Sequence, residues 1–166
     1  SNPEDELLSP KETSVREYTT QIAPVNGFNP IAPNQSNIIQ NGVGNNANVF
    51  QQNLGSDPNI VNIMQSGNLN QTLVEQIGEG NSLELEQNGN SNNYQVKMQG
   101  NNINSKVGQF GNNNQLSHEL NVSGENYEMI QNGDNNRLMH IDHSSRSVPP
   151  VVIQEGNNMN LRIEQR

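Results

Sequence analysis

Residues 65–92 read QSGNLNQTLVEQIGEGNSLELEQNGNSN, and this stretch repeats one pattern three times at intervals of eleven residues. The pattern is a glutamine, a glycine two positions later and an asparagine three positions after the glycine, and it begins at Gln65, Gln76 and Gln87. Polar and apolar residues alternate between one glycine and the next glutamine. Self-similarity at a fixed period indicates a repeat architecture, in which each repeat is one structural unit stacked on its neighbours.

The same pattern continues through most of the chain. Its Gln-x-Gly triplets begin at six glutamines, which are Gln40, Gln65, Gln87, Gln109, Gln131 and Gln154. Eleven residues after each of these stands a second key position, occupied by Gln51, Gln76, Met98, Leu120, Asp142 and Gln165. We therefore predict six repeats, with the ranges 34–58, 59–80, 81–102, 103–124, 125–147 and 148–166. Residues 1–33 are acidic, rich in proline and without the period, so we interpret them as an extended leader or linker.

The composition excludes several classes of protein. The 166 residues suffice for one domain, but only 30% are hydrophobic and 4% aromatic, too few for a conventional globular core. Asparagine and glutamine exceed a quarter of the chain, which is typical of segments prone to β-aggregation. A net charge of −9 argues against nucleic acid as a partner. The chain has no cysteine and no stretch apolar enough to span a membrane, and its polar start is consistent with a signal peptide removed before it.

The alternation within each half-repeat has the period of a half-buried strand. Counting in twos from each glutamine gives one face whose middle is apolar, as at Val61 and Ile63, and whose ends are amides. Charged residues fall on the opposite face, with Asp142 as the clear exception and Glu125 at a strand start. The sequence therefore predicts an all-β protein, a parallel β-solenoid of six strand-turn-strand coils. Its two parallel sheets would face each other as in cross-β structure, after an irregular N-terminal segment.

The outward charges are ordered along the predicted stack. Two sets of three are spaced by 22 residues and alternate in sign, namely Glu75, Lys97 and Glu119, and Glu84, Lys106 and Glu128. If each repeat is one coil, residues 22 apart lie directly above one another, and each set becomes a column of opposite charges. Each opposite pair contributes about 0.2–1 kcal/mol, and like charges cost a similar amount. A winding shifted by half a repeat would lose this match.

The glutamine, glycine and asparagine of the pattern suit a corner that repeats in every coil. A buried amide without a partner costs roughly 2–7 kcal/mol, but stacked carboxamides donate to the next coil and accept from the previous one. Glycine adopts the positive φ of a sharp turn, and asparagine tolerates it. We predict an amyloid core ladder made of Gln40, Gly42, Asn45, Gln51, Gln65, Gly67, Asn70, Gln76, Gln87, Gly89, Asn92, Gln109, Gly111, Asn114, Gln131, Gly133, Asn136, Gln154, Gly156 and Gln165.

The motif Q-x-G-x-x-N, with a second glutamine eleven residues after the first, resembles the curlin repeat of bacterial curli fibres. Both halves are complete in the repeats that begin at Gln40 and Gln65. Met98, Leu120 and Asp142 replace the second glutamine in the next three repeats. Met159 replaces the asparagine in the last repeat. The resemblance covers about four-fifths of the chain.

This resemblance implies a secreted structural subunit of an extracellular amyloid fibre, which stacks end to end and supports biofilm matrix and adhesion at a bacterial surface. The implied partners are further copies of the chain, a companion curlin subunit, periplasmic chaperones and an outer-membrane secretion channel, for which residues 1–33 would carry the targeting segment. Whether the chain is the major or the nucleator subunit stays open. Independently of the family, a final strand at 159–165 without a cap favours the addition of another chain.

Rival interpretations rest on fewer residues. We expect no enzyme, because no nucleophile–base arrangement is recognisable and the solenoid interior is too narrow for a substrate pocket. His118 and His140 are 22 apart on the inner face, near Asp142. A metal site needs convergent ligands with fixed geometry, so we predict no metal and no other cofactor there. The alternative that remains open is a monomeric β-solenoid that acts as an adhesin or binding module.

Overall fold

The computed structural model describes residues 15–21, 33–142 and 151–165, and every regular element in these ranges is a β-strand. The strands form two parallel sheets, here called sheet A and sheet B. Sheet A contains β1 (Val15–Gln21), β3 (Asn46–Asn53), β5 (Gln71–Gly78), β7 (Asn93–Gln99), β9 (Gln115–Asn121), β11 (Arg137–Asp142) and β13 (Asn160–Gln165), in that spatial order. Sheet B contains β2 (Gln35–Asn41), β4 (Ile60–Ser66), β6 (Ser82–Asn88), β8 (Asn104–Phe110), β10 (Asn126–Asn132) and β12 (Val151–Glu155).

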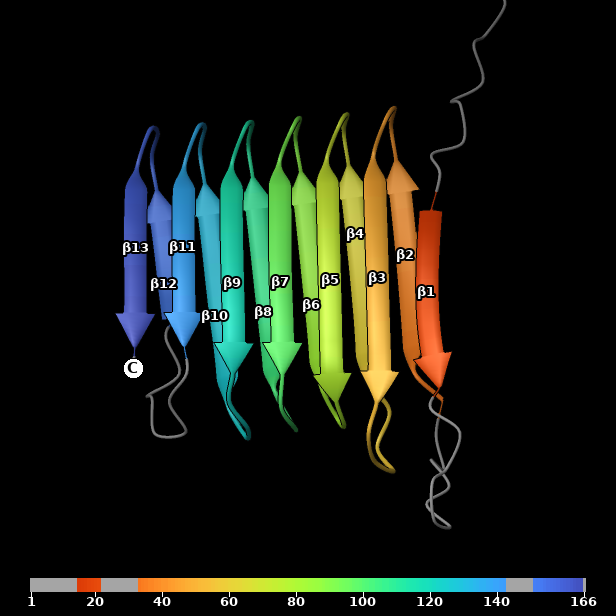
Figure 1. Cartoon of the computed structure of the whole chain (residues 1–166). Helices are drawn as coiled ribbons and strands as arrows, with labels where there is room; N and C mark the ends of the chain where they lie inside the picture. Colours follow the sequence, from red (N-terminus) through yellow and green to blue (C-terminus); the bar gives the residue numbers. More distant parts are fainter. Residues whose placement is uncertain (1–14, 22–32, 143–150, 166) are drawn as a thin grey trace, which may run out of the picture.

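The chain changes sheet at each turn, so that successive strands wind into coils. Figure 1 shows the strands alternating between two layers, with β1 and β13 at opposite ends of the stack. From β2 onwards, each coil has one strand in sheet B and the next in sheet A. This arrangement confirms the predicted all-β parallel solenoid of about six coils.

The register follows the sequence period. Gln65 in β4 pairs with Gln87 in β6, and Gln87 pairs with Gln109 in β8, so residues 22 apart lie side by side. Gln40 and Gln65 are 25 apart and still pair, because the loop 54–59 between β3 and β4 holds the additional residues. Insertions in a solenoid are absorbed by its loops in this way. The second long connection, 143–150, lies outside the described residues.

The core is a narrow layer between the two sheets. Each strand alternates buried and less buried positions, as in β6, where Leu83, Leu85 and Gln87 are buried and Glu84 is exposed. Asp142 is the one aspartate or glutamate that is fully buried in the described part of the chain. The Tyr127 hydroxyl donates a 2.7 Å hydrogen bond to its Oδ2. In β11, which has no repeat glutamine, the inward carboxylate is therefore paired across the core.

Residues 15–21 differ from the expectation of a leader without repeat structure. They form β1, which pairs in parallel with β3, from Val15 opposite Ala47 to Gln21 opposite Asn53. The Gln-x-Gly pattern is absent from β1, so the sequence period did not predict this strand. Residues 1–14 and 22–32 of the predicted leader lie outside the described residues.

Within the described ranges, the structure contains no helix of the length and apolar character needed to cross a membrane.

Candidate functional site

Six inward glutamines of sheet B form the longest continuous polar feature of the interior, here called the glutamine column. The Nε2 of each of the first five donates to the Oε1 of the glutamine one coil further along, at 2.5–2.8 Å. The members are Gln40, Gln65, Gln87, Gln109, Gln131 and Gln154. The four central side chains have no exposed surface. Because buried amides are stable only when paired, every coil of this column depends on its neighbours.

The same amides also join the two sheets. Gln87 Nε2 donates a second hydrogen bond to the carbonyl oxygen of Gln71 at 3.2 Å, and Gln109 Nε2 donates to that of Asn93 at 3.1 Å. Corresponding bonds begin at Gln65, Gln131 and Gln154. A central glutamine therefore uses both of its N–H groups and its oxygen, and it links adjacent coils as well as opposite sheets.

The equivalent position in sheet A carries a shorter amide ladder. Gln51 Nε2 donates to Gln76 Oε1 at 2.9 Å, and Gln76 Nε2 contacts the sulfur of Met98 at 3.6 Å. The next two positions along the stack are the buried Leu120 and Asp142. Gln165 continues this register through β13, opposite Asp142. The structure thus brings the predicted second glutamines together only in the first two coils.

The turn that follows each sheet B strand carries an inward column of asparagines. Asn92 Oδ1 accepts hydrogen bonds from the backbone N–H of Asn114, and Asn92 Nδ2 donates to the carbonyl of Gly111 at 2.8 Å. The same bonds join the other predicted members, which are Asn45, Asn70, Asn114 and Asn136. In the last coil the backbone N–H of Met159 still donates to Asn136 Oδ1, so the substitution by methionine leaves that acceptor paired.

A second column in these turns was missed in the sequence. It consists of Asn68, Asn90, Asn112, Asp134 and Asn157, and it lies on the outside of the turn. In each case the side-chain Oδ1 accepts from the backbone N–H one coil earlier, as Asn90 does from Asn68 at 3.0 Å. Their spacing of 22 or 23 residues was the available signal. The column through Asn34, Asn59 and Asn81 in the opposite turns repeats the inward column instead, because each Oδ1 accepts from the backbone N–H one coil later.

The first five glycines of the pattern are required by close approach as well as by conformation. All six, Gly42, Gly67, Gly89, Gly111, Gly133 and Gly156, have φ between 105° and 128°. A Cβ atom at Gly89 would stand 1.9 Å from the carbonyl oxygen of Gly111 in the next coil. Any side chain there collides with backbone, so these turns stack at the spacing of the sheets only with glycine.

The two predicted charge columns lie on the outer faces. Glu75, Lys97 and Glu119 are neighbours in sheet A, and Glu84, Lys106 and Glu128 are neighbours in sheet B. Lys97 Nζ lies 3.8 Å from Glu75 Oε1, with both side chains more than a third exposed. Among the described residues this is the one ion pair within either column. Exposed pairs of this kind contribute at most about 1 kcal/mol.

A buried cluster with different chemistry lies between the two sheets and is here called the histidine cluster. His118, His140 and Asp142 belong to sheet A, and Tyr127 belongs to β10 of sheet B. His118 and His140 pair in register, with ring centroids 4.7 Å apart, and Tyr127 packs on His118 at 5.1 Å. None of the four imidazole nitrogens has a hydrogen-bond partner among the described residues. Burial lowers the pKa of His118 well below 6.5, and the neighbouring His140 lowers it further. Burial also lowers the pKa of His140, against a smaller raising effect of Asp142.

The lowered pKa values favour the neutral form of both imidazole rings, which pack in the core. Within the described part of the chain, no group of three or more histidine, aspartate or glutamate side chains is arranged to hold a metal ion.

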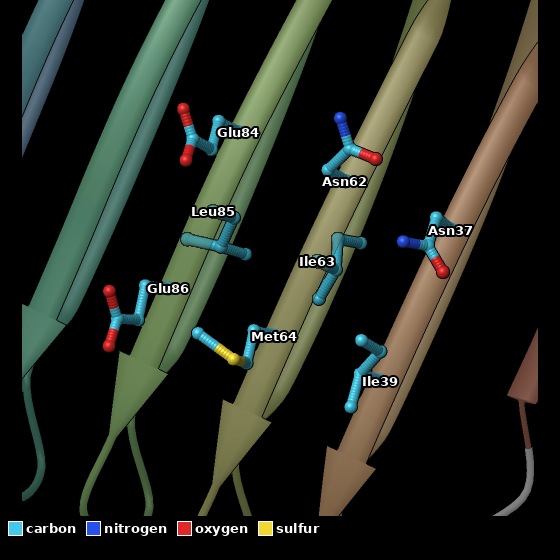
Figure 2. Close-up of a pocket in the computed structure, with 8 residues that line it drawn as sticks. All are labelled: Asn37, Ile39, Asn62, Ile63, Met64, Glu84, Leu85 and Glu86. Atoms are coloured by element: carbon cyan, nitrogen blue, oxygen red, sulfur yellow. The ribbon is translucent and has the colours of Figure 1, made fainter.

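The outer face of sheet B has a shallow open hollow of about 240 Å³ across β2, β4 and β6. Figure 2 shows Asn62 and Met64 beside the carboxylates of Glu84 and Glu86 on neighbouring strands. These two carboxylates are the titratable groups of its lining, which holds no nucleophile beside a base. Such a surface can contact a partner, but it encloses no reaction site.

A parallel solenoid with internal amide columns and stacked glycine turns defines the class of β-solenoid repeat proteins. The family model of the curlin associated repeat matches residues 58–89, which span β4, β5 and β6. This match supports membership of the curlin family. No curated protein and no solved structure matches the chain.

Proposed function

We propose that this protein is a secreted structural subunit of an extracellular curli-type amyloid fibre, which assembles by end-to-end stacking of its coils. The curlin repeat and the β-solenoid fold support a curli-type structural subunit. The observation that carries the assembly step is the polarity of the glutamine column, because all of its amides donate towards the C-terminal coil.

That polarity makes the two ends of the column complementary. At the N-terminal end, the buried Gln40 Oε1 has no hydrogen-bond partner among the described residues. At the other end, Gln154 Nε2 donates to the Arg137 carbonyl, and the described residues contain no further glutamine for its second N–H. In a head-to-tail stack, Gln154 Nε2 of one copy donates to Gln40 Oε1 of the next. A head-to-tail contact without rotational closure produces an open filament.

The sheet edges support the same direction of growth. β12 and β13 form the C-terminal edges of the two sheets, and β2 forms the N-terminal edge of sheet B. An edge strand presents unpaired backbone N–H and C=O groups, to which another parallel strand can add. Addition of one subunit to another therefore extends both sheets and the amide column together.

The direct test is to incubate the purified protein and follow thioflavin fluorescence together with fibre diffraction. Assembly predicts growing fluorescence and reflections at about 4.8 Å along the fibre and about 10 Å across it. A lasting monomer without a cross-β signal would instead favour the alternative, a monomeric adhesin or binding module. The hollow on sheet B is the surface that such a module would use.

Matched variants connect assembly to the register of the column. Gln65→Ala and Gln87→Ala each interrupt the column, whereas Gln95→Ala removes an exposed carboxamide from the outer face of β7. We expect the first two to slow assembly at least tenfold and the third to leave the rate within twofold of the unaltered protein. Equal effects of all three would contradict a role of the buried column in assembly.

We further propose a division into an assembling repeat domain, residues 34–166, and a leader, residues 1–33, that addresses the chain to an outer-membrane secretion channel. A companion curlin subunit and periplasmic chaperones are the expected partners, and biofilm matrix and adhesion the expected roles. The role is structural, with no catalytic step. Immunogold labelling of intact cells tests the location, because a subunit of this kind should be found on surface fibres.

A further inference from the structure

The two sheets of the solenoid contain different numbers of strands. Sheet A has seven and sheet B has six, because β1 lies on the edge of β3 while no described strand lies on the corresponding edge of β2. Figure 1 shows β1 at the end of the stack, beyond the first complete coil. Without β1, each sheet would hold six strands, one for each repeat.

This difference matters for end-to-end stacking. A second copy that pairs its β13 with β1 also leaves its β12 one strand spacing, about 4.8 Å, short of β2. Sheet B would then contain a gap with unpaired backbone groups, and Gln154 would not reach Gln40. Both sheets continue without a gap only when β13 of the second copy lies directly on β3.

The sequence of β1 follows the repeat pattern at this edge less closely than the sequence of β13 does. In the register of β3, Glu17 of β1 stands opposite the buried Val49, and Thr19 stands opposite the buried Gln51. Along sheet A, Ile163 of β13 lies in the same register as Val49, and Gln165 of β13 lies in the same register as Gln51. A branched apolar residue continues the valine position, and a glutamine continues the amide position, so β13 matches the edge as a repeat strand does.

We propose that β1 is a displaceable cap on the edge of β3, and that the partner which displaces it is β13 of a second copy of this chain. This proposal rests on the proposed assembly. In that assembly, β1 competes with β13 of the incoming copy for the edge of β3. The exchange replaces the pair β1–β3 by β13–β3 and adds a new pair β12–β2. It also supplies the buried Gln40 Oε1 with a donor, so assembly gains hydrogen bonds while β1 slows its first step.

A reversible lock of β1 tests the proposal. Arg16 and Asn48 are register partners in β1 and β3, and the chain has no cysteine of its own. In the full chain carrying Arg16→Cys and Asn48→Cys, an intramolecular disulfide holds β1 on its edge. We expect the oxidised monomer to show a lag at least tenfold longer than the same protein after reduction. Equal lags in the two states would overturn the proposal.

Other outcomes of this experiment are also decisive. If the two thiols stay free or join different molecules, β1 does not lie on β3 and the proposal fails. If the reduced variant and the unaltered protein both remain monomeric, the proposed function fails instead, and the two failures are thereby distinguished.

Two further variants in β1 test the same competition without a disulfide. Glu17→Val with Thr19→Gln gives β1 the residues of a repeat strand, and we expect a lag several-fold longer. Glu17→Pro with Tyr18→Pro removes two successive backbone N–H groups, at least one of which faces β3, and we expect a lag several-fold shorter. Unchanged lags in both variants, or shifts in the opposite directions, would contradict the cap.

Discussion

The inner faces of sheet A and sheet B carry different residues at the position of the repeat glutamine. Sheet B keeps a glutamine in all six coils and joins them by hydrogen bonds from Gln40 to Gln154. Sheet A keeps the ladder only from Gln51 to Gln76 and then places Met98, Leu120 and Asp142 in the same register. The coils therefore keep one register in both sheets, although only sheet B has a continuous glutamine column.

The difference has a physical basis. The interrupted ladder of sheet A leaves no amide hydrogen unpaired, because Gln76 Nε2 donates to the Ile60 carbonyl and contacts the sulfur of Met98. Asp142, further along the same register, accepts from the Tyr127 hydroxyl. Sheet A can thus vary its inner residues, and it contains His118 and His140 where sheet B has Val107 and Met129. Sheet B cannot vary one glutamine without leaving the donor and the acceptor of two others unpaired.

The largest expected effect concerns the turns that leave the two sheets. Gly89→Ala, after a sheet B strand, places a Cβ 1.9 Å from a backbone oxygen, whereas Gly124, after a sheet A strand, has no atom within 4 Å of such a Cβ. Both alanines carry the cost of a positive φ, about 1–2 kcal/mol. We expect Gly89→Ala to lower the free energy of unfolding by more than about 4 kcal/mol and Gly124→Ala by the conformational cost alone. Urea unfolding of the monomer measures both.

A second prediction compares equivalent core positions in one coil. Gln109→Leu leaves Gln87 Nε2 and Gln131 Oε1 without their column partners, at a cost of about 3 kcal/mol in unfolding free energy. Leu120→Met, at the matching position of sheet A, conserves volume and should cost less than about 1.5 kcal/mol. Similar losses in both variants, measured by urea unfolding, would show that the two columns contribute equally.

The pH dependence of stability should arise in sheet A. Burial lowers the pKa of His118 and His140 in the folded chain, so as the pH falls through the ordinary value of 6.5 the unfolded chain takes up more protons than the folded chain. Stability is therefore complete above this pH and falls as the pH decreases below it. Between pH 7.5 and 5.5 we expect a loss on the order of 1–2 kcal/mol. His118→Val with His140→Val, which continues the valine position of the sheet, should abolish that loss in urea unfolding at the two pH values.

The smallest expected effect concerns the outer charge columns. Lys97→Glu places three carboxylates in a row on sheet A and removes the 3.8 Å ion pair with Glu75. We expect a loss of about 0.5–1 kcal/mol, reduced in 0.5 M salt. Lys106→Glu makes the same row on sheet B, where no ion pair lies within the described residues, and should cost less. A larger loss of stability for Lys106→Glu than for Lys97→Glu would contradict this comparison of the two charge columns.

The sequence predicted those features of the fold that depend on period alone. A spacing of 22 residues placed Gln65, Gln87 and Gln109 in one register, and alternation in twos placed Asp142 on the inner face. The partner of Asp142 could not be predicted, because period says which residues stack within a sheet but not which face each other across the core. Tyr127, on the opposite sheet, is such a residue.

Features without the motif were missed for related reasons. β1 lacks glutamine and glycine at the repeat positions, and its place is set by the open edge of β3. Gly108 interrupts the outer face of β8 where other strands have side chains, and the ring of Phe110 covers it, since a Cβ at Gly108 would stand 2.6 Å from that ring. The spacing of Asn68 and Asn90 was visible, but the turn geometry that brings Oδ1 to the next N–H was not.

Residues one repeat apart lie on top of one another along the solenoid. Asn46, Gln115 and Arg137 are exposed first positions of β3, β9 and β11. Spin labels at positions 46 and 115 are three strand spacings apart, about 14 Å, and labels at 46 and 137 are four apart, about 19 Å. Electron–electron double resonance should give two narrow distributions whose means differ by about one strand spacing. Broad distributions, or means tens of ångströms longer, would contradict the stacked coil.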